Sequence, residues 1–290
     1  MGLMLLTALA MTAFAANSVL NRLAVGGGMI GAIDFALLRL AAGAMMLAVL
    51  VMLRYRLRGG VVWPGGAGRL VGVAGLLLYL FGFSLAYLAL DAGVGALILF
   101  GVVQITMFAG ALWSRESVPL RRWLGAGLAF GGMVVLVAPG GARADLWHGG
   151  VMALAGFGWG IYSLAGRRGG DALAATAANF GLALPLAAGL VWLLPETLTG
   201  GAAAAAATPM GLGLALISGA VTSGLGYALW YALVPQLGAA RAAVAQLTAP
   251  VIAALMGLAA LGEGISLRFV AAATLVLGGV ALASLTRRTQ

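Results

Sequence analysis

The sequence predicts an all-α integral membrane protein whose ten transmembrane helices form two inverted five-helix repeats. Three observations support this fold: an apolar composition, the spacing of the charged residues, and one motif that occurs in each half. Of 290 residues, 63% are hydrophobic and 8% are charged, with a mean hydropathy of +1.11. A soluble domain is roughly 45–50% apolar and about one quarter charged. Most of this chain is therefore expected to lie within a lipid bilayer.

Each predicted span is an apolar segment bounded by charges, prolines or glycine clusters. About 20 apolar residues cross a bilayer as a helix, and a helix satisfies its own backbone polar groups there. The predicted spans cover residues 2–21, 32–53, 70–90, 93–112, 120–138, 149–166, 172–194, 209–233, 239–260 and 266–285. Only short connectors remain between them, so no soluble domain is expected.

The first span is predicted to be a retained helix rather than a signal peptide. No basic segment precedes it, whereas a signal peptide normally begins with one. Its segment FAANSVLNR, residues 14–22, also resembles WGIYSLAGR, residues 159–167, with an aromatic residue, Ser and Arg at the same spacing. A cleaved leader has no reason to resemble an internal helix.

A motif of 17 residues defines the internal repeat. ESVPLRRWLGAGLAFGG, residues 116–132, and EGISLRFVAAATLVLGG, residues 263–279, share Glu, Leu-Arg and Gly-Gly at the same spacing without a gap. The motif predicts two repeat units, residues 1–142 and 143–290. Each unit has five spans, an odd number, so the second enters the membrane inverted. Inverted repeats are typical of secondary transporters that work by alternating access.

The distribution of arginine predicts the orientation in the membrane. Three arginines lie in odd-numbered connectors, namely Arg22, Arg143 and Arg268. Twelve lie in even-numbered connectors or at the carboxyl terminus: Arg54, Arg56, Arg58, Arg69, Arg115, Arg121, Arg122, Arg167, Arg168, Arg241, Arg287 and Arg288. Short cytoplasmic loops retain positive charge, so both termini are expected in the cytoplasm, with the protein in the cell inner membrane.

Several functions are disfavoured by what the chain contains. It has no Cys and a single histidine, His148, so we expect no disulfide, no metal and no cofactor. The net charge of +9 is spread singly between spans, which does not suit nucleic acid. No carboxylate lies near the middle of a span, which disfavours a proton-coupled cation pump and predicts facilitative transport or exchange. Basic residues are also scarce at depth, which disfavours phosphorylated substrates.

Aromatic and amide side chains at mid-span depth are the candidate substrate site. Tyr79, Phe83 and Tyr87 recur every four residues, on one face of a helix. The full candidate set is Asn17, Tyr79, Phe83, Tyr87, Phe100, Gln104, Trp159, Tyr162, Tyr227, Gln246 and Pro250. Polar groups at this depth are costly unless they face partners or a wet cavity. The alternative interpretation is that the rings serve packing or belong to the interfacial belt.

Three charged residues are candidates for a gate or interface role. Glu116 and Glu263 begin the repeated motif and are predicted at opposite membrane faces, where each either gates the pathway or holds an interfacial turn. Arg39 is predicted in the outer part of the second span. We interpret it as a structural partner of Asp34 or of a backbone carbonyl, with substrate binding as the alternative.

The segment YALWYALVPQLGAARAAVAQLTAPVIAALMGLAALGE, residues 227–263, followed by a Gly-Gly helix, carries a family resemblance. Together with ten spans in two sets of five, it resembles the EamA-type drug/metabolite transporters. Its Tyr-rich span, Gly-Ala-Ala-Arg turn, Pro250 and Glu263 match that pattern, although the first half has Val103-Gln104 where a Pro is expected. The resemblance implies secondary transport of small molecules without ATP hydrolysis.

Within that family, the aromatic residues are similar to those of the YddG-like exporters of aromatic and other amino acids. The resemblance therefore implies an amino acid or related metabolite as substrate, with the lipid bilayer as the other partner. Alternatives are an exporter of drugs or toxic cations, a non-transporting receptor or scaffold, and an enzyme acting on lipid-linked substrates. The oligomeric state is left open, and a monomer is compatible with the sequence.

Overall fold

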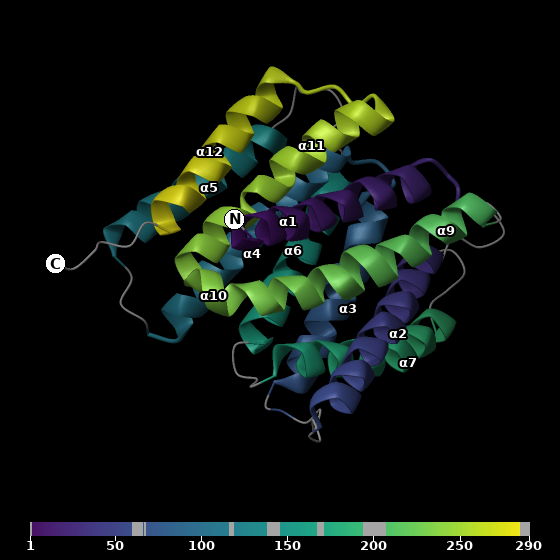
Figure 1. Ribbon diagram of the computed structural model, residues 1–290. Helices are drawn as coiled ribbons and strands as arrows, with labels where there is room; N and C mark the ends of the chain where they lie inside the picture. Colours follow the sequence, from purple (N-terminus) through teal and green to yellow (C-terminus); the bar gives the residue numbers. More distant parts are fainter. Residues whose placement is uncertain are drawn as a thin grey trace.

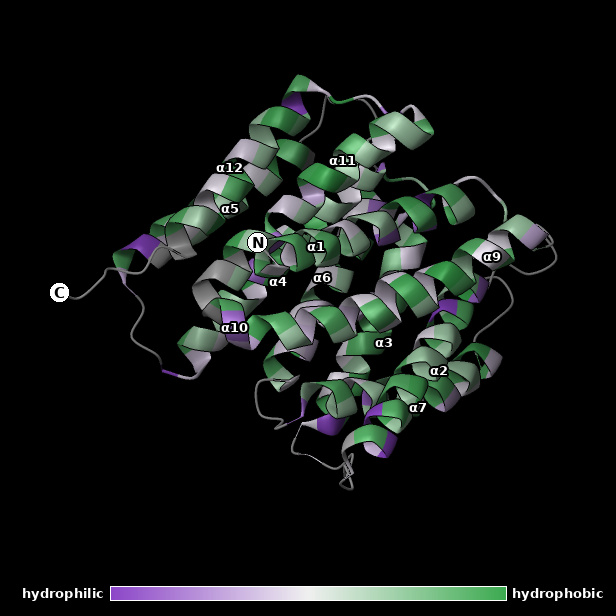
Figure 2. Cartoon of the chain, in the orientation of Figure 1, coloured by the Kyte–Doolittle hydropathy of each residue, from purple (hydrophilic) through white to green (hydrophobic). Residues whose placement is uncertain are grey.

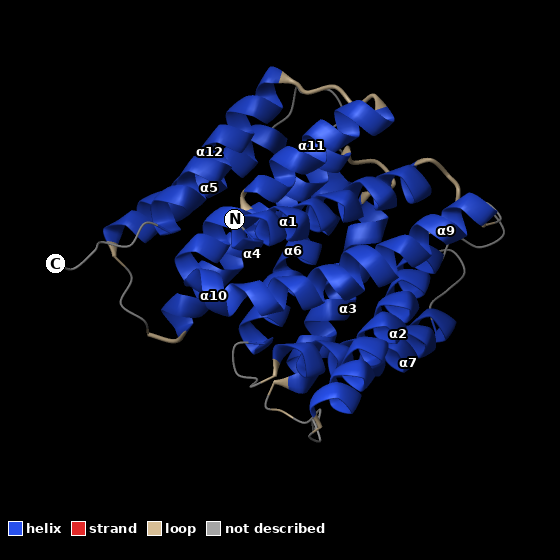
Figure 3. Cartoon of the chain, viewed as in Figure 1, coloured by secondary structure: helices blue, strands red, loops and turns tan. Residues whose placement is uncertain are grey.

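The computed structural model describes residues 2–59, 66, 68–115, 119–137, 146–166, 171–193 and 207–284. Within these ranges the regular structure is helical (Figures 1 and 3). The helices are α1 (Gly2–Asn21), η1 (Arg22–Gly26), α2 (Ala32–Arg58), α3 (Arg69–Ala86), α4 (Ala92–Trp113), α5 (Leu120–Val137), α6 (Leu146–Gly166), α7 (Ala172–Leu193), α9 (Pro209–Ile217), η3 (Ser218–Leu225), α10 (Gly226–Gln246), α11 (Thr248–Leu261) and α12 (Leu267–Ser284). The predicted all-helical fold is confirmed.

Most of the helices have the length and surface of membrane spans. Among the described residues, 7 helices are long and apolar enough to cross a bilayer, and α5 and α12 contain the shorter apolar helices Trp123–Leu136 and Leu267–Leu282. Large apolar side chains such as Leu70, Leu193 and Leu267 are exposed on the outside of the bundle. Figure 2 shows hydrophobic residues along nearly every helix, with hydrophilic ones mostly near helix ends. This distribution suits a protein surrounded by lipid.

One predicted boundary is wrong. The sequence predicts a turn at the Gly-Ala-Ala-Arg segment, residues 238–241, between the eighth and ninth spans. These residues instead lie inside α10, which continues to Gln246 and curves round before it meets α11 (Figure 1). Five alanines and a glutamine favour helix after residue 238 and outweigh a single glycine. The break between the two helices falls at Leu247, and α11 begins at Thr248. This places Pro250 in the first turn of α11, where a residue without an N–H removes no helical hydrogen bond.

Glycine-mediated contacts hold the helices close together. The repeated motif forms α5 and α12, which lie side by side (Figure 1). A Cβ on Gly132 would lie 2.8 Å from the carbonyl oxygen of Ala272, and one on Gly279 would lie 2.8 Å from the amide nitrogen of Ala129. Helices α3 and α6 cross in the same way at Gly75 and Gly158. Small residues at such crossings let helix backbones approach.

Odd-numbered connectors contact one another at one end of the bundle, and even-numbered connectors lie at the other end. At one end, Arg22 of η1 reaches Asp91 and Glu263, which lie in the third and ninth connectors. At the other end, Arg54 of α2 donates to Asp171 before α7 (3.0 Å). Burial opposes ionisation of Asp171, but the bonds from Arg54 and from the amide of Ala174 outweigh it and lower the pKa of this carboxyl. Odd and even connectors thus separate as alternating spans require.

Candidate functional site

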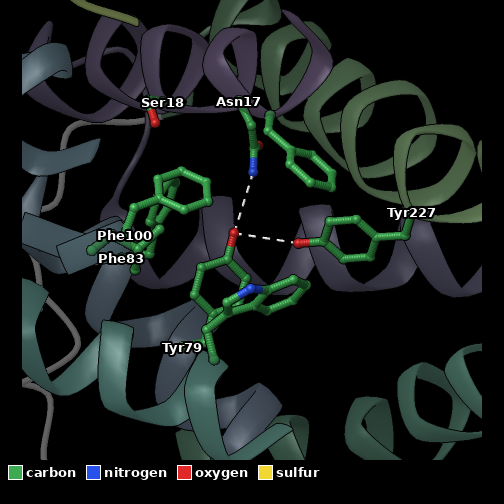
Figure 4. A pocket seen from close by; sticks show the side chains of 9 residues that line it. Asn17, Ser18, Tyr79, Phe83, Phe100 and Tyr227 are labelled. Carbon is green, nitrogen blue, oxygen red and sulfur yellow. Dashed lines mark hydrogen bonds between the residues drawn. The ribbon is translucent and has the colours of Figure 1, made fainter. Parts of the chain in front are cut away.

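A cavity lies between helices from both halves of the chain. The space between its lining side chains amounts to about 340 Å³ when open solvent is counted. Helices α1, α3, α4, α6 and α10 supply its walls. The lining residues are Phe14, Asn17, Ser18, Tyr79, Phe83, Leu99, Phe100, Trp159 and Tyr227 (Figure 4). Six of the candidate binding residues are among them: Asn17, Tyr79, Phe83, Phe100, Trp159 and Tyr227.

The aromatic rings of the cavity contact one another. Trp159 lies 4.9 Å from Tyr79 and 5.0 Å from Tyr227 between ring centroids, and Phe14 meets Tyr227 edge-on at 5.7 Å. The crossing of α3 and α6 at Gly75 and Gly158 explains the first of these contacts. Tyr79 is one turn beyond Gly75, and Trp159 follows Gly158 directly. Tight backbone packing therefore brings the two rings together beside the cavity.

The polar groups of the cavity form one hydrogen-bonded network around Tyr79. Asn17 Nδ2 donates to the Tyr79 hydroxyl (3.4 Å), and the Tyr227 hydroxyl donates to it as well (3.3 Å), as Figure 4 shows. Asn17 Oδ1 accepts hydrogen bonds from the hydroxyls of Ser218 and Thr222 in η3. The network fixes the orientation of the Asn17 amide and joins α1, α3 and the eighth span.

Arg39 contacts this network, which corrects its predicted environment. Its Nη2 donates to the hydroxyls of Tyr79 (2.6 Å) and Tyr227 (3.4 Å), and its Nε donates to Ser223 Oγ (3.0 Å). The side chain is fully buried, whereas Asp34 is exposed. The expected pairing with Asp34 at the outer part of the span is therefore wrong. Arg39 starts on the buried face of α2 and extends into the bundle behind the cavity wall.

Residues at equivalent positions of the two halves line the cavity together. Phe14 and Trp159 occupy the same position in the two similar segments at residues 14–22 and 159–167, and both face the cavity. Phe14 was not in the candidate set, although this similarity could have identified it. Ser18 was also missed, and it shares its repeat position with Ser163. Leu99 carries no sequence signal that separates it from other apolar residues.

Five candidate residues lie outside the cavity lining in this conformation. Tyr87 is buried at the end of α3, where its hydroxyl donates to the carbonyl of Ala92 (3.2 Å). Tyr162 stacks on Trp159 and donates to Thr176 of α7. Gln104 is half-buried in α4. Gln246 is half-buried at the end of α10, and Pro250 is buried in the first turn of α11.

Glu263 joins three segments at the end of the bundle that contains η1. Its Oε1 accepts from Arg22 Nε (3.2 Å), and its Oε2 accepts from the amide of Ala92 at the start of α4 (2.8 Å). Burial raises the pKa of this carboxyl, and nearby Asp91 adds to the rise, although Ala92 and Arg22 oppose it. Arg22 also donates to the carbonyls of Tyr87 and Leu88, so the cluster links η1 to the segment after α3 and to the start of α4. The other motif glutamate, Glu116, lies outside the described residues.

Nothing in the site resembles a metal centre or a hydrolytic one. The described ranges contain no group of three or more His, Asp or Glu residues that could hold a metal ion. The lining groups are rings, hydroxyls and one amide, which bind and orient a small molecule. A bundle of apolar helices around a cavity with this lining suits a membrane protein that binds a small molecule.

Comparisons with known proteins specify the family. The EamA-like transporter family matches residues 147–285. The chain is 46% identical over 283 residues to the uncharacterized protein PA1977 of Pseudomonas aeruginosa, covering 96% of this chain and 93% of that protein. A crystal structure of a protein at 18% identity has a TM-score of 0.64 and covers 100% of this chain and 99% of that one, which shows the shared fold. The chain belongs to the EamA-like transporter family and is a multi-pass membrane protein, not an enzyme.

Proposed function

We propose that this transporter exports or exchanges amino acids, including aromatic ones, across the inner membrane. The observation that carries the proposal is the cavity itself. Its rings suit an apolar or aromatic side chain, because aromatic pairs favour offset and edge-on contacts. Its hydroxyls and the Asn17 amide suit the polar end of an amino acid.

The proposed mechanism is alternating access between two inverted units, residues 1–142 and 143–290, with both termini in the cytoplasm. The Arg22–Glu263 cluster supports this mechanism as a gate at the end opposite to Arg54 and Asp171. Because the rings of Tyr79, Trp159 and Tyr227 contact one another, an amino acid enters only when they separate. The present conformation is therefore interpreted as a contracted one.

An exporter of toxic cations is the main alternative within the family. The fully buried guanidinium of Arg39 beside the network disfavours it, because a like charge repels a cationic substrate. No carboxylate among the described residues reaches the cavity to offset that charge.

Exchange assays in proteoliposomes test the proposal. Purified protein is reconstituted into liposomes loaded with unlabelled phenylalanine, and uptake of radiolabelled phenylalanine is measured. Competitors are aromatic amino acids, aliphatic amino acids, a sugar and a quaternary ammonium compound. We expect competition by amino acids, strongest for aromatic ones. Uptake equal to that of empty liposomes, or competition by the quaternary ammonium compound alone, would contradict the proposal.

A further inference from the structure

We propose that Arg39 is the binding group for the substrate carboxylate, so that the site selects for a carboxylate and against amines that lack one. The inference rests on the proposed function and assigns a specific chemical group to it. The polar network beside the cavity carries a full positive charge and more hydrogen-bond donors than acceptors. A bound carboxylate supplies the negative charge and the hydrogen-bond acceptors that this network lacks.

The first observation is an unused donor on Arg39. This side chain is fully buried, and its Nε and Nη2 donate to Ser223, Tyr79 and Tyr227. Its Nη1 is buried too and has no hydrogen-bond partner in the described part of the chain. Buried polar groups are normally paired, and an unpaired one marks either a cost to stability or a missing ligand.

The second observation is the crowding of donors at one oxygen. Arg39 Nη2, Asn17 Nδ2 and the Tyr227 hydroxyl all donate to the Tyr79 oxygen. A phenolic oxygen has two lone pairs and a proton of its own to donate. A carboxylate offers about four acceptor positions, which is enough for the hydroxyls of Tyr79 and Tyr227 as well as the guanidinium.

The third observation is the missing counter-charge. Of the acidic residues that the structure describes, Asp34 is exposed, and Asp91, Asp171 and Glu263 pair with arginines at the ends of the bundle. Among the residues that the structure describes, only dipoles and rings compensate the charge of Arg39. A buried charge without a partner is costly, and its attraction for an incoming anion is correspondingly strong. Arginine also binds a carboxylate through two parallel hydrogen bonds.

The position of Arg39 places this charge against the cavity wall. Its guanidinium carbon lies 5.0 Å from the ring centre of Tyr79 and 4.9 Å from that of Phe83, and both rings line the cavity. Arg39 also donates to the hydroxyls of Tyr79 and Tyr227, two residues that line the cavity. A carboxylate that enters between these hydroxyls reaches Arg39, while its apolar side chain stays among Phe14, Trp159 and Tyr227.

The test uses three compounds that differ only in their polar groups: phenylalanine, 3-phenylpropionate without the amine, and phenethylamine without the carboxylate. Each competes with radiolabelled phenylalanine in the exchange assay. For the wild type we expect 3-phenylpropionate to compete at least tenfold better than phenethylamine. In Arg39→Gln we expect that ratio to fall at least tenfold, and in Arg39→Lys to fall less. Arg54→Gln removes a guanidinium at the end of α2 and is the matched control, with an unchanged ratio.

The experiment tests carboxylate binding by Arg39 separately from amino-acid transport. Equal competition by phenethylamine in the wild type, or an unchanged ratio in folded Arg39→Gln, would overturn it while leaving amino-acid transport intact. If phenylalanine is not transported at all, the proposed function fails. The same three compounds are then tested for thermal stabilisation of the purified protein, where stabilisation by phenethylamine but not by 3-phenylpropionate overturns the inference. If Arg39→Gln does not fold, the wild-type preference alone decides.

Discussion

At the residue scale, Trp159 contacts three other rings, since it meets Tyr79, Tyr162 and Tyr227 within 5.2 Å between centroids. We expect Trp159→Leu to weaken the apparent affinity for phenylalanine about 2- to 10-fold, because an aromatic contact contributes roughly 0.5–1.5 kcal/mol. Trp113→Leu is the control, since Trp113 is 92% exposed at the end of α4. Competition curves in the exchange assay provide the measurement. Equal affinities in both variants would remove Trp159 from the site.

The raised pKa of Glu263 predicts that the stability of the folded protein depends on pH. Its pKa in the folded protein is raised by burial above the ordinary value of 4.5, so the folded state holds this proton more tightly than the unfolded state. The contribution is fully present below pH 4.5 and is lost as the pH rises through the raised pKa. We expect Glu263→Gln, which cannot titrate, to lose this part of the pH dependence of the melting temperature.

Asp171 is the control for Glu263, because its pKa is shifted in the opposite direction. Its pKa is lowered, so its contribution is present above the ordinary carboxyl range and is lost as the pH falls through the lowered pKa. Tryptophan fluorescence during heating, at a series of pH values, measures both variants. If Glu263→Gln and Asp171→Asn change the pH profile in the same direction, the assignment of the two environments is wrong.

Individual residues differ in how far the sequence could identify them. Tyr79, Phe83 and Tyr227 were predictable because tyrosines and phenylalanines at span-centre depth, repeated in both halves, are unusual in helices that only face lipid. Arg39 was not, because its partners Ser223 and Tyr227 lie more than 180 residues away along the chain. Asp34 is the only acidic residue near Arg39 in the sequence, so it was the expected partner. Burial and long-range pairing required the assembled fold.

At the element scale, the crossing of α3 and α6 depends on glycine. A Cβ on Gly158 would lie 2.7 Å from the carbonyl oxygen of Gly75 and 2.9 Å from the amide nitrogen of Tyr79. We expect Gly158→Ala to destabilise the protein by about 1–3 kcal/mol, because the two backbones must separate. It also moves Tyr79 away from Trp159 and lowers phenylalanine transport.

The control for this substitution lies two turns earlier in α6. A Cβ on Gly150 would meet no atom within 4 Å, so Gly150→Ala is expected to be neutral or to stabilise by up to about 1 kcal/mol through helix propensity. Thermal unfolding of both variants in the same detergent is the measurement. Equal melting temperatures would show that the crossing tolerates a methyl group.

The extents of most helices were predictable from apolar runs between charges, as for α4 and α7. The end of the eighth span was not. The sequence suggested a turn at Gly238, but alanine-rich sequence after it forms helix as readily as a connector, and only the packed fold shows where the chain reverses. The two Gly-Gly pairs of the repeated motif, Gly131-Gly132 and Gly278-Gly279, also differ from what the sequence alone shows. Only the second glycine of each pair faces a neighbouring helix, because helical geometry turns the first toward open space.

At the scale of the whole molecule, the arginine distribution predicts that both termini are cytoplasmic. A phosphatase that is active only outside the cytoplasm, fused after Gln290, is expected to be inactive, and the same enzyme inserted between Asp91 and Ala92 is expected to be active. The positive-inside rule provides the physical reason. Activity of the carboxyl-terminal fusion would contradict the predicted topology.

Energy coupling is the second prediction at this scale. Within the described spans, no carboxylate or histidine lies at mid-depth, so no group is available there whose protonation could follow the alternating site. We expect phenylalanine to equilibrate across liposomes without accumulating against its gradient when only a pH gradient is imposed. Accumulation that a protonophore abolishes, and that disappears in Glu116→Gln or Glu263→Gln, would show proton coupling instead.

The central claim is that an aromatic amino acid binds in the cavity between the two halves. A structure of the purified protein determined with bound L-tryptophan tests it most directly. We predict the indole among Phe14, Trp159 and Tyr227, with the Tyr79–Trp159 rings farther apart than 4.9 Å and the carboxylate directed toward Arg39. Tryptophan bound elsewhere, with this cavity still contracted, would contradict the claim.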